Sequence, residues 1–188
     1  KGKLAEWNLD LSTTYGRDKS EIGVEDSANA SLFADTGYSP TTFKAGAFIA
    51  SQLTTTLESS REVDVGWSKP LTFAAGVEHR IDKYEIQAGD PASRYKEGSQ
   101  SYPGFSLTDA GRHRRTNKAA YINFAGNPIK DLTVDLAGRY EHFSDFGAAR
   151  VGKLTSRYEL TPTAAVRGTF SNGFRAPTLA ESYYSATN

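Results

Sequence analysis

Regular alternation of apolar and polar side chains is the feature of this sequence that most limits its fold. From Leu132 to His142, the apolar side chains occupy one parity and the polar ones the other. Successive side chains of a strand point to opposite faces, so this period of two indicates a strand whose faces meet different surroundings. The same pattern occurs at residues 7–15 and 71–82, and further strands are predicted at 53–65, 119–126, 151–160 and 164–172.

These strands predict an all-β chain of about seven antiparallel, up-and-down strands, with no segment of helical period. Several strands reach ten or more residues, about the length that a tilted strand needs to cross roughly 30 Å of hydrocarbon. The non-apolar parity carries a wide band of mixed charge, which would cost several kcal/mol per unpaired group in a dry core and therefore favours a water-filled or plugged lumen. For any single strand, a soluble sheet packed on a core fits equally well. The residues of the band are Glu58, Glu62, Asp64, Glu78, Arg80, Asp135, Arg139, Glu141, Lys153, Arg157, Glu159 and Arg167.

The connections between the strands fall into two kinds. Those at 67–70, 127–131 and 160–163 are short and contain proline, whereas 17–50 and 88–117 are long and polar, and a short connection lies near 145–147. In an up-and-down sheet, chain order places every proline turn at one end. Short turns at one end and long loops at the other are typical of outer-membrane barrels. Trp7 and Trp67 near the short turns, and Tyr15, Tyr140 and Phe143 near the long loops, suggest two aromatic girdles.

Composition excludes several classes of function. The 188 residues carry no net charge and no Cys, which argues against nucleic-acid binding and excludes disulfides and thiol catalysis. The sequence contains no run of 18 apolar residues, so it predicts no transmembrane helix. His79, His113 and His142 are far apart in the sequence, so we expect no metal site and no cofactor. His142 and Ser144 offer no catalytic set because no orienting acid is identifiable, so we do not expect an enzyme.

The segment Ser171–Glu181 reads Ser-Asn-Gly-Phe-Arg-Ala-Pro-Thr-Leu-Ala-Glu and follows a predicted strand. It resembles the barrel signature of TonB-dependent outer-membrane receptors. The resemblance continues upstream at 76–80, 89–91, 139–141, 144–147 and 153–154, and it covers roughly residues 50 to 185. The motif positions are Gly173, Phe174, Arg175, Ala176, Pro177 and Glu181.

This resemblance implies a 22-stranded transmembrane barrel, closed by an N-terminal plug, in a bacterial outer membrane. Residues 1–188 would form part of the barrel wall, with the plug and the closing C-terminal strand absent. The implied function is import of a scarce nutrient, such as an iron siderophore, a cobalamin-like ligand or an oligosaccharide, with energy relayed by TonB. The implied partners are outer-membrane lipid, the TonB complex through the absent plug, and the ligand. A passive porin-like barrel, or a soluble β-domain that binds carbohydrate or protein, remains open.

Ligand binding is expected in the long loops, which combine cations with aromatic rings. Such a composition can bind an anionic or ring-bearing ligand through charge-assisted hydrogen bonds and stacking. A solvated surface loop is the alternative for each residue. The resemblance also places the Gly173–Pro177 stretch at the extracellular end of the wall, where we expect a structural role and a pairing of Arg175 with lumenal carboxylates. The candidate ligand-binding residues are Arg94, Tyr95, Tyr102, Arg112, His113 and Arg114.

Overall fold

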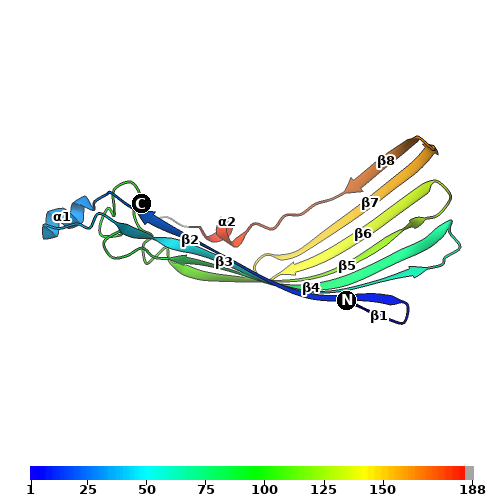
Figure 1. The fold of residues 1–188 in the computed structure, drawn as a ribbon, viewed down its shortest axis with the longest axis horizontal. Helices are drawn as coiled ribbons and strands as arrows, with labels where there is room; N and C mark the ends of the chain where they lie inside the picture. The colour runs from blue at the N-terminus through cyan, green and yellow to red at the C-terminus, as the bar shows by residue number, and fades with distance from the viewer. Residues whose placement is uncertain (185–188) are drawn as a thin grey trace. The chain divides into compact units, whose positions relative to one another are not determined.

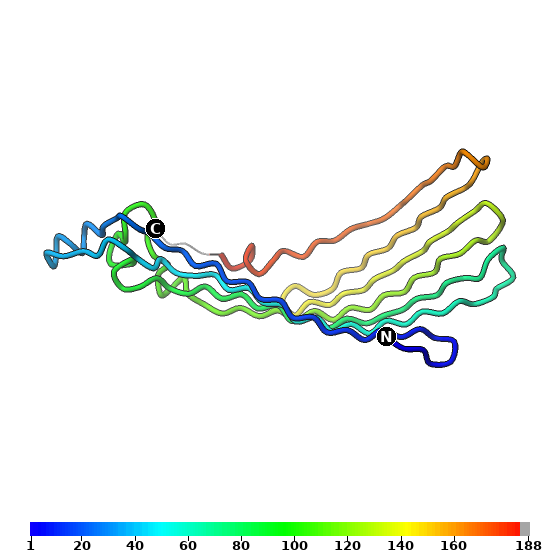
Figure 2. Tube along the Cα trace, viewed as in Figure 1, coloured from blue at the N-terminus to red at the C-terminus, as the bar shows by residue number. Residues whose placement is uncertain are grey.

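The structure is a computed structural model that describes residues 1–184. Eight up-and-down strands form one antiparallel sheet, in which each strand is hydrogen-bonded to its neighbours in the sequence (Figures 1 and 2). The all-β, up-and-down prediction is therefore confirmed. The strands are β1 (Gly2–Leu4), β2 (Trp7–Val24), β3 (Phe43–Val63), β4 (Lys69–Gln87), β5 (Gly111–Asn127), β6 (Leu132–Phe143), β7 (Gly147–Thr161) and β8 (Ala164–Ser171).

Strand number and strand length differ from the prediction. The additional strand, β1, has only three residues, too few to show a period of two. β2, β3 and β5 also extend well into the segments predicted as long loops, and β5 includes the candidate residues Arg112, His113 and Arg114. Placing these three residues in a loop was therefore wrong. In β5 the backbone pairing continues over residues 111–117, where both faces are polar, so this strand extends beyond the alternation that predicted it. In β3 the added residues include the buried Phe43, Ala45 and Ala47.

Strand register confirms the two faces predicted for the centre of the sheet. Leu136 of β6 lies opposite Leu154 of β7, and Leu132 lies opposite Tyr158, all with the apolar parity. Asp135 lies opposite Thr155, and Glu141 opposite Ala149, with the polar parity. We call these the apolar face and the charged face of the sheet.

Aromatic side chains meet on the apolar face near the short turns. The Trp7 ring contacts the Phe73 ring edge-on at 5.9 Å, and Phe73 lies 5.1 Å from Phe124. Phe143 does not belong to a girdle on this face, contrary to the prediction. It has the parity of the charged face, is only 2% exposed, and stacks on Phe146 at 4.3 Å.

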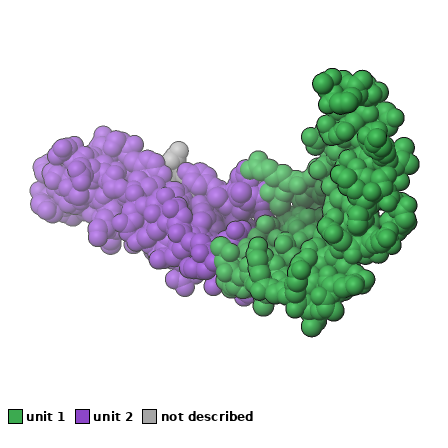
Figure 3. All heavy atoms as spheres, turned by 45° about the vertical axis from the view of Figure 1, so that its right-hand side comes forward, with its two compact units in different colours: residues 1–14, 53–81, 116–176 green, residues 15–52, 82–115, 177–188 purple. Residues whose placement is uncertain are grey.

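The chain divides into two compact units (Figure 3). Unit 1 comprises residues 1–14, 53–81 and 116–176, and its sheet exposes large apolar side chains such as Leu136 (50%) and Phe170 (80%). Unit 2 comprises residues 15–52, 82–115 and 177–188. A core lies in the described part of unit 2, where Tyr84, Ile86, Phe105 and Leu179 pack together.

Two short helices interrupt the β-structure of the described residues 1–184, and no period in the sequence predicted them. Helix α1 (Ala30–Thr36) follows the N-cap residue Asn29 and ends at Gly37, which adopts the left-handed conformation with φ of 73°. Helix α2 (Leu179–Tyr183) follows Thr178. Within residues 1–184, neither helix has the length and apolarity needed to cross a membrane.

Candidate ligand-binding site

Two connections of unit 2 fold against each other. They are residues 25–42, between β2 and β3, and residues 88–110, between β4 and β5; we call them together the loop module. Asn29 joins the two connections and is 0% exposed. Its Nδ2 group donates to the carbonyl oxygens of Ala92 (2.9 Å) and Tyr95 (2.8 Å), while its Oδ1 accepts from the backbone N–H of Leu32 at 2.9 Å. One buried amide therefore caps α1 and anchors the second connection.

Ser93 anchors the second connection from within. It is fully buried, and its Oγ donates to the carbonyl oxygens of Lys44 (3.1 Å) and Asp90 (2.9 Å). The Asp90 carboxylate accepts from the backbone N–H groups of Ser93 (2.7 Å) and Lys44 (3.0 Å). A Cβ on Gly104 would lie 2.1 Å from the Ser93 Oγ, so only glycine fits at this position. These contacts give the Gly89-Asp90-Pro91 segment a structural role.

Gly46 allows β3 to pass close beneath the loop module. Its φ is +132°, and a Cβ there would lie 2.4 Å from the carbonyl oxygen of Gln87 and 2.7 Å from Phe105 Cδ2. Phe105 and Tyr84 both pack on Phe48, with ring centroids at 4.9 Å and 6.1 Å. The aromatic core under the loop module therefore depends on a glycine.

Three of the candidate residues make contacts within the loop module. Arg94 donates through Nε to the carbonyl oxygen of Gly89 (3.2 Å), and Tyr102 packs edge-on against Phe105 (6.1 Å). The Tyr95 hydroxyl donates to Asp35 Oδ2 at 2.9 Å, and Lys96 pairs with the same carboxylate. The hydrogen bonds from Lys96 and then from Tyr95 hold the pKa of Asp35 below its usual range.

The remaining three candidate residues lie on β5 and face alternate sides. Arg112 pairs with Glu85 of the neighbouring strand, through Nε to Oε2 (3.0 Å) and Nη2 to Oε1 (3.4 Å). The His113 ring stacks on the Tyr183 ring at 3.9 Å, and Arg114 is exposed. The six candidates thus fall into two sets, one in the loop module and one on β5. That any of them binds a ligand stays a prediction.

The motif at 171–181 has an identifiable structural role at each end. Asn172 extends the pairing of β7 with β8, because its Nδ2 donates to the carbonyl oxygen of Arg150 (3.0 Å) and its Oδ1 accepts from the N–H of Gly152 (2.6 Å). Phe174 packs against Phe143 and Phe146, at 6.1 Å and 5.7 Å. This half of the motif completes the end of the sheet in unit 1.

The second half of the motif belongs to unit 2. Arg115, which is 4% exposed, donates through Nη1 to the carbonyl oxygen of Pro177. Thr178 and Glu181 form a capping box at α2: Glu181 Oε2 accepts from the N–H of Thr178 (2.6 Å), and Thr178 Oγ1 accepts from the N–H of Glu181 (3.0 Å). Leu179 then enters the core of unit 2. The pairing of Arg175 with lumenal carboxylates stays a prediction.

The charged face of unit 1 carries a network of polar contacts across the strands. Arg139 of β6 donates to Glu141 of its own strand (2.8 Å) and to Glu78 of β4 (3.2 Å). The Tyr121 hydroxyl of β5 donates to Glu58 of β3 at 2.7 Å. Opposite charges therefore lie side by side on this face. No three His, Asp or Glu side chains are placed to hold a metal ion in the part of the chain that the structure describes.

Sequence reasoning missed several residues on which these sites depend. Asn29, Ser93 and Arg115 also contact partners distant in the chain, and no local pattern identifies those partners. The capping box is different, because Thr178 and Glu181 have the Thr-x-x-Glu spacing that marks a helix start. That signal was present in the motif and could have predicted α2.

Comparison with protein families gives a match along nearly the whole chain. Residues 2–188 match the family described as TonB dependent receptor-like, beta-barrel. Comparisons with curated proteins and with solved structures gave no match. The match agrees with the antiparallel sheet, its two distinct faces and the motif at 171–181. The chain belongs to the TonB-dependent receptor β-barrel family.

Proposed function

We propose that this chain forms part of the wall of a bacterial outer-membrane receptor that binds a scarce nutrient and imports it with energy relayed by TonB. The wall would belong to a 22-stranded barrel whose plug and closing strand lie outside residues 1–188. The observation that carries the proposal is the pair of faces in unit 1. One face exposes Leu136, Leu154 and Phe170, while the other pairs Arg139 with Glu78 and Glu141.

Such a sheet suits a position between lipid and water. Exposed apolar side chains on one whole face would favour aggregation in water, whereas hydrocarbon solvates them. The mixed charges of the other face need water or polar partners, which a lumen supplies. These two requirements support an outer-membrane location.

The loop module supports a role in ligand capture. Its contacts through Asn29 and Ser93 hold the two connections in one conformation, so less conformational entropy is lost when a ligand binds. Arg112 and Arg114 are exposed on β5, and their guanidinium groups can bind an anionic ligand. An iron siderophore, a cobalamin-like ligand and an oligosaccharide are the ligand classes we propose to test.

Uptake measurements test the proposal. A strain deleted for the gene would be compared with the complemented strain for uptake of labelled ferric siderophores, cobalamin and oligosaccharides, each with and without TonB. We expect one ligand class whose uptake needs both the gene and TonB. Uptake that needs the gene but persists without TonB would contradict the energised step and favour a passive porin-like barrel.

A second experiment tests the binding residues. We expect the R112A/R114A double variant to weaken binding of the identified ligand at least tenfold, because charge-assisted hydrogen bonds are lost. The matched control is K130Q/K153Q, which removes the same charge from exposed residues outside the loop module and outside β5. Equal weakening in both variants would contradict a binding role for Arg112 and Arg114.

A further inference from the structure

Residues 1–188 contain one Asn-Gly pair, Asn172-Gly173, which lies inside the motif at 171–181. The other asparagines that have a successor precede Leu, Ala, Lys, Phe or Pro. In an Asn-Gly pair the backbone nitrogen of the glycine can attack the Cγ atom of the asparagine, because no Cβ hinders the approach and glycine adopts the required backbone angles freely. Asn172 is therefore the asparagine of this segment whose side-chain amide is most readily lost.

The structure holds the Asn172 amide against β7. The side chain donates from Nδ2 to the carbonyl oxygen of Arg150 at 3.0 Å and accepts at Oδ1 from the backbone N–H of Gly152 at 2.6 Å. The backbone N–H of Asn172 donates to the carbonyl oxygen of Gly152 at 3.2 Å. Attack by the nitrogen of Gly173 would turn the planar Cγ tetrahedral and expel Nδ2 as ammonia. The two side-chain hydrogen bonds to β7 therefore oppose the reaction.

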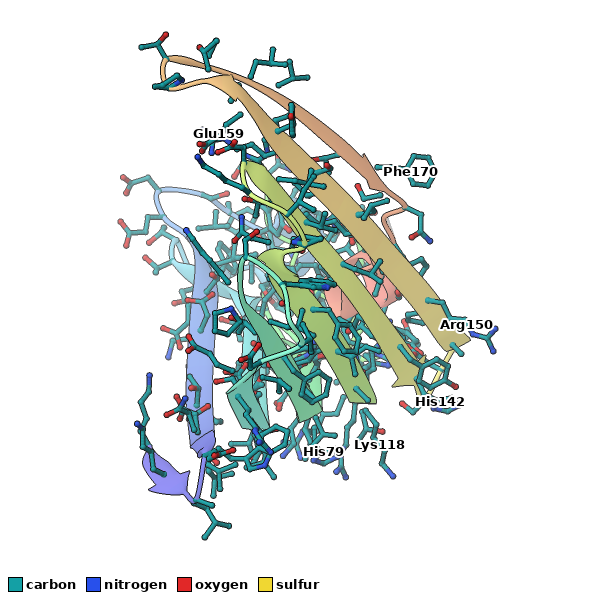
Figure 4. All side chains as sticks on the ribbon, turned by 90° about the vertical axis from the view of Figure 1, so that its right-hand side faces the viewer. His79, Lys118, His142, Arg150, Glu159 and Phe170 are labelled. Atoms are coloured by element: carbon teal, nitrogen blue, oxygen red, sulfur yellow. The ribbon has the colours of Figure 1, made fainter. Side chains whose placement is uncertain are left out.

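These contacts lie at the end of a strand, where the structure can open locally. The last ladder pair of β7 and β8 joins Lys153 to Ser171. Strand β7 extends past this pair through Arg150, which Figure 4 shows beyond the end of β8. Strand ends open at a small free-energy cost without unfolding of the whole domain. Asn172 and Gly173 are both exposed, so water can reach the pair when this end opens.

We propose that Asn172 is a site of spontaneous deamidation and that pairing with β7 suppresses the reaction. The nitrogen of Gly173 forms a bond to Cγ of Asn172 and loses its proton, the Cγ–Nδ2 bond breaks, and ammonia leaves a cyclic succinimide. Water then opens either carbonyl of the ring to give aspartate or isoaspartate. The net reaction converts asparagine and water into the acid and ammonia. This inference goes beyond the proposed function and does not depend on it, since it needs only the pairing of β7 with β8.

The products of the reaction cannot restore the contacts that the amide makes. An aspartate still accepts from the N–H of Gly152, but its second oxygen carries no hydrogen and would face the carbonyl oxygen of Arg150. Isoaspartate adds one methylene to the backbone and shifts the residues that follow. Among them is Phe174, which packs on Phe143 and Phe146. Deamidation therefore makes the opening of this strand end permanent and marks the chains in which it has opened.

The fold does not require a glycine at position 173, which provides a precise variant. A Cβ on Gly173 would meet no atom within 4 Å, and Gly173 is not among the glycines with positive φ. G173A should therefore keep both side-chain hydrogen bonds of Asn172, while its methyl group hinders the attack on Cγ. This variant separates the chemistry of the Asn-Gly pair from the structure of the strand end.

The test uses the protein as its gene encodes it, purified in its folded state and incubated in heavy-oxygen water at mildly alkaline pH. Peptide mass spectrometry measures incorporation of heavy oxygen at residue 172 in the folded parent, in the parent unfolded in urea, and in both states of G173A. N172D reproduces one product, and hydrogen exchange at residues 173–176 measures the release of the strand end. The matched control is N8D, which makes the same change at an exposed asparagine of β2.

We expect incorporation at residue 172 to be at least about tenfold faster in the unfolded parent than in the folded parent, a comparison that requires no variant to fold. G173A should slow the reaction of the unfolded chain at least about tenfold. Exchange at residues 173–176 should rise in N172D and stay at the parent rate in N8D. Equal rates in the folded and unfolded parent would overturn the protection by β7. No incorporation at residue 172 in the unfolded parent, an undiminished rate in unfolded G173A, or unchanged exchange in N172D would each overturn the inference as well.

Discussion

Arg115 donates a hydrogen bond from its buried guanidinium to the carbonyl oxygen of Pro177, 62 residues further along the chain. The contact joins β5 to the segment that begins α2. Pro177 has no backbone N–H group, so its carbonyl oxygen is the only backbone group with which it can form a hydrogen bond. The Phe-Arg-Ala-Pro stretch thus contacts the sheet at its last residue as well as at Phe174, which packs on Phe143 of β6.

Replacing Arg115 should loosen the α2 segment. We expect R115Q to lose the bond to Pro177 and to cost about 1.5–3 kcal/mol, the range for a hydrogen bond to a charged group. The measurement is the rate of proteolysis within residues 177–184, with R114Q as the control because Arg114 is exposed on the other face of β5. The same rate in R115Q and R114Q would contradict the anchoring role of Arg115.

Variants of Asn29 should separate its two tasks. N29S keeps a side-chain oxygen for the cap of α1 but removes the donors to Ala92 and Tyr95, whereas N29A removes both. Each unpaired buried group costs about 1–3 kcal/mol, and the cap about 1 kcal/mol. Hydrogen exchange should therefore rise in residues 88–100 for both variants and in α1 mainly for N29A. Unchanged exchange at 88–100 in N29S would contradict the bridge between the two connections.

Gly46 should tolerate no side chain. In G46A the new Cβ would clash with the Gln87 carbonyl and with Phe105, and the φ of +132° is itself strained for alanine. We expect a loss of at least 1–3 kcal/mol in the stability of unit 2, measured by denaturant-dependent proteolysis of the loop module. The control is G16A on β2, where no atom lies within 4 Å of the new Cβ. G46A as stable as G16A would show that β3 does not pass close beneath the module.

The contacts of Asp35 should make the loop module sensitive to acid. The pKa of Asp35 is lowered by its hydrogen bonds with Lys96 and Tyr95, so the ionised form stabilises the fold. That contribution is present above the ordinary pKa of an aspartate and is lost as the pH falls through the lowered value. Proteolysis of the module at low salt should accelerate on acidification in the parent and much less in D35N. Because the pair is exposed, 0.5 M salt should reduce the difference; identical acid profiles for parent and D35N would contradict this role.

The faces of the sheet could be predicted from sequence because their signal is local. Leu136 and Asp135 differ in parity, and the period of two alone assigns them to opposite faces. The ends of the strands could not be predicted. From Gly111 to Asn117 both parities of β5 are polar. The start of this strand is therefore determined by backbone pairing, which cannot be recognised from the residue types.

The candidate site was predicted less well than the wall, for a physical reason. Charged and aromatic residues in a loop indicate what chemistry is available but not which partner each side chain finds. Tyr95 bonds to Asp35 and His113 stacks on Tyr183, contacts that span 60 and 70 residues. Only folded geometry decides which of these side chains remain exposed.

The claim that unit 1 is a wall between lipid and water can be tested most directly by cysteine scanning of β6. Residues 1–188 contain no Cys, so no native thiol of this segment interferes with single cysteines placed from Leu132 to Phe143. Spin labels at these positions, in the protein as its gene encodes it and in native outer membranes, would be compared for accessibility to oxygen and to a water-soluble nickel complex. The account predicts a strict period of two, with positions 132, 134, 136, 138 and 140 accessible to oxygen and 133, 135, 137, 139 and 141 accessible to nickel. Equal accessibility of both parities to the nickel complex would contradict it.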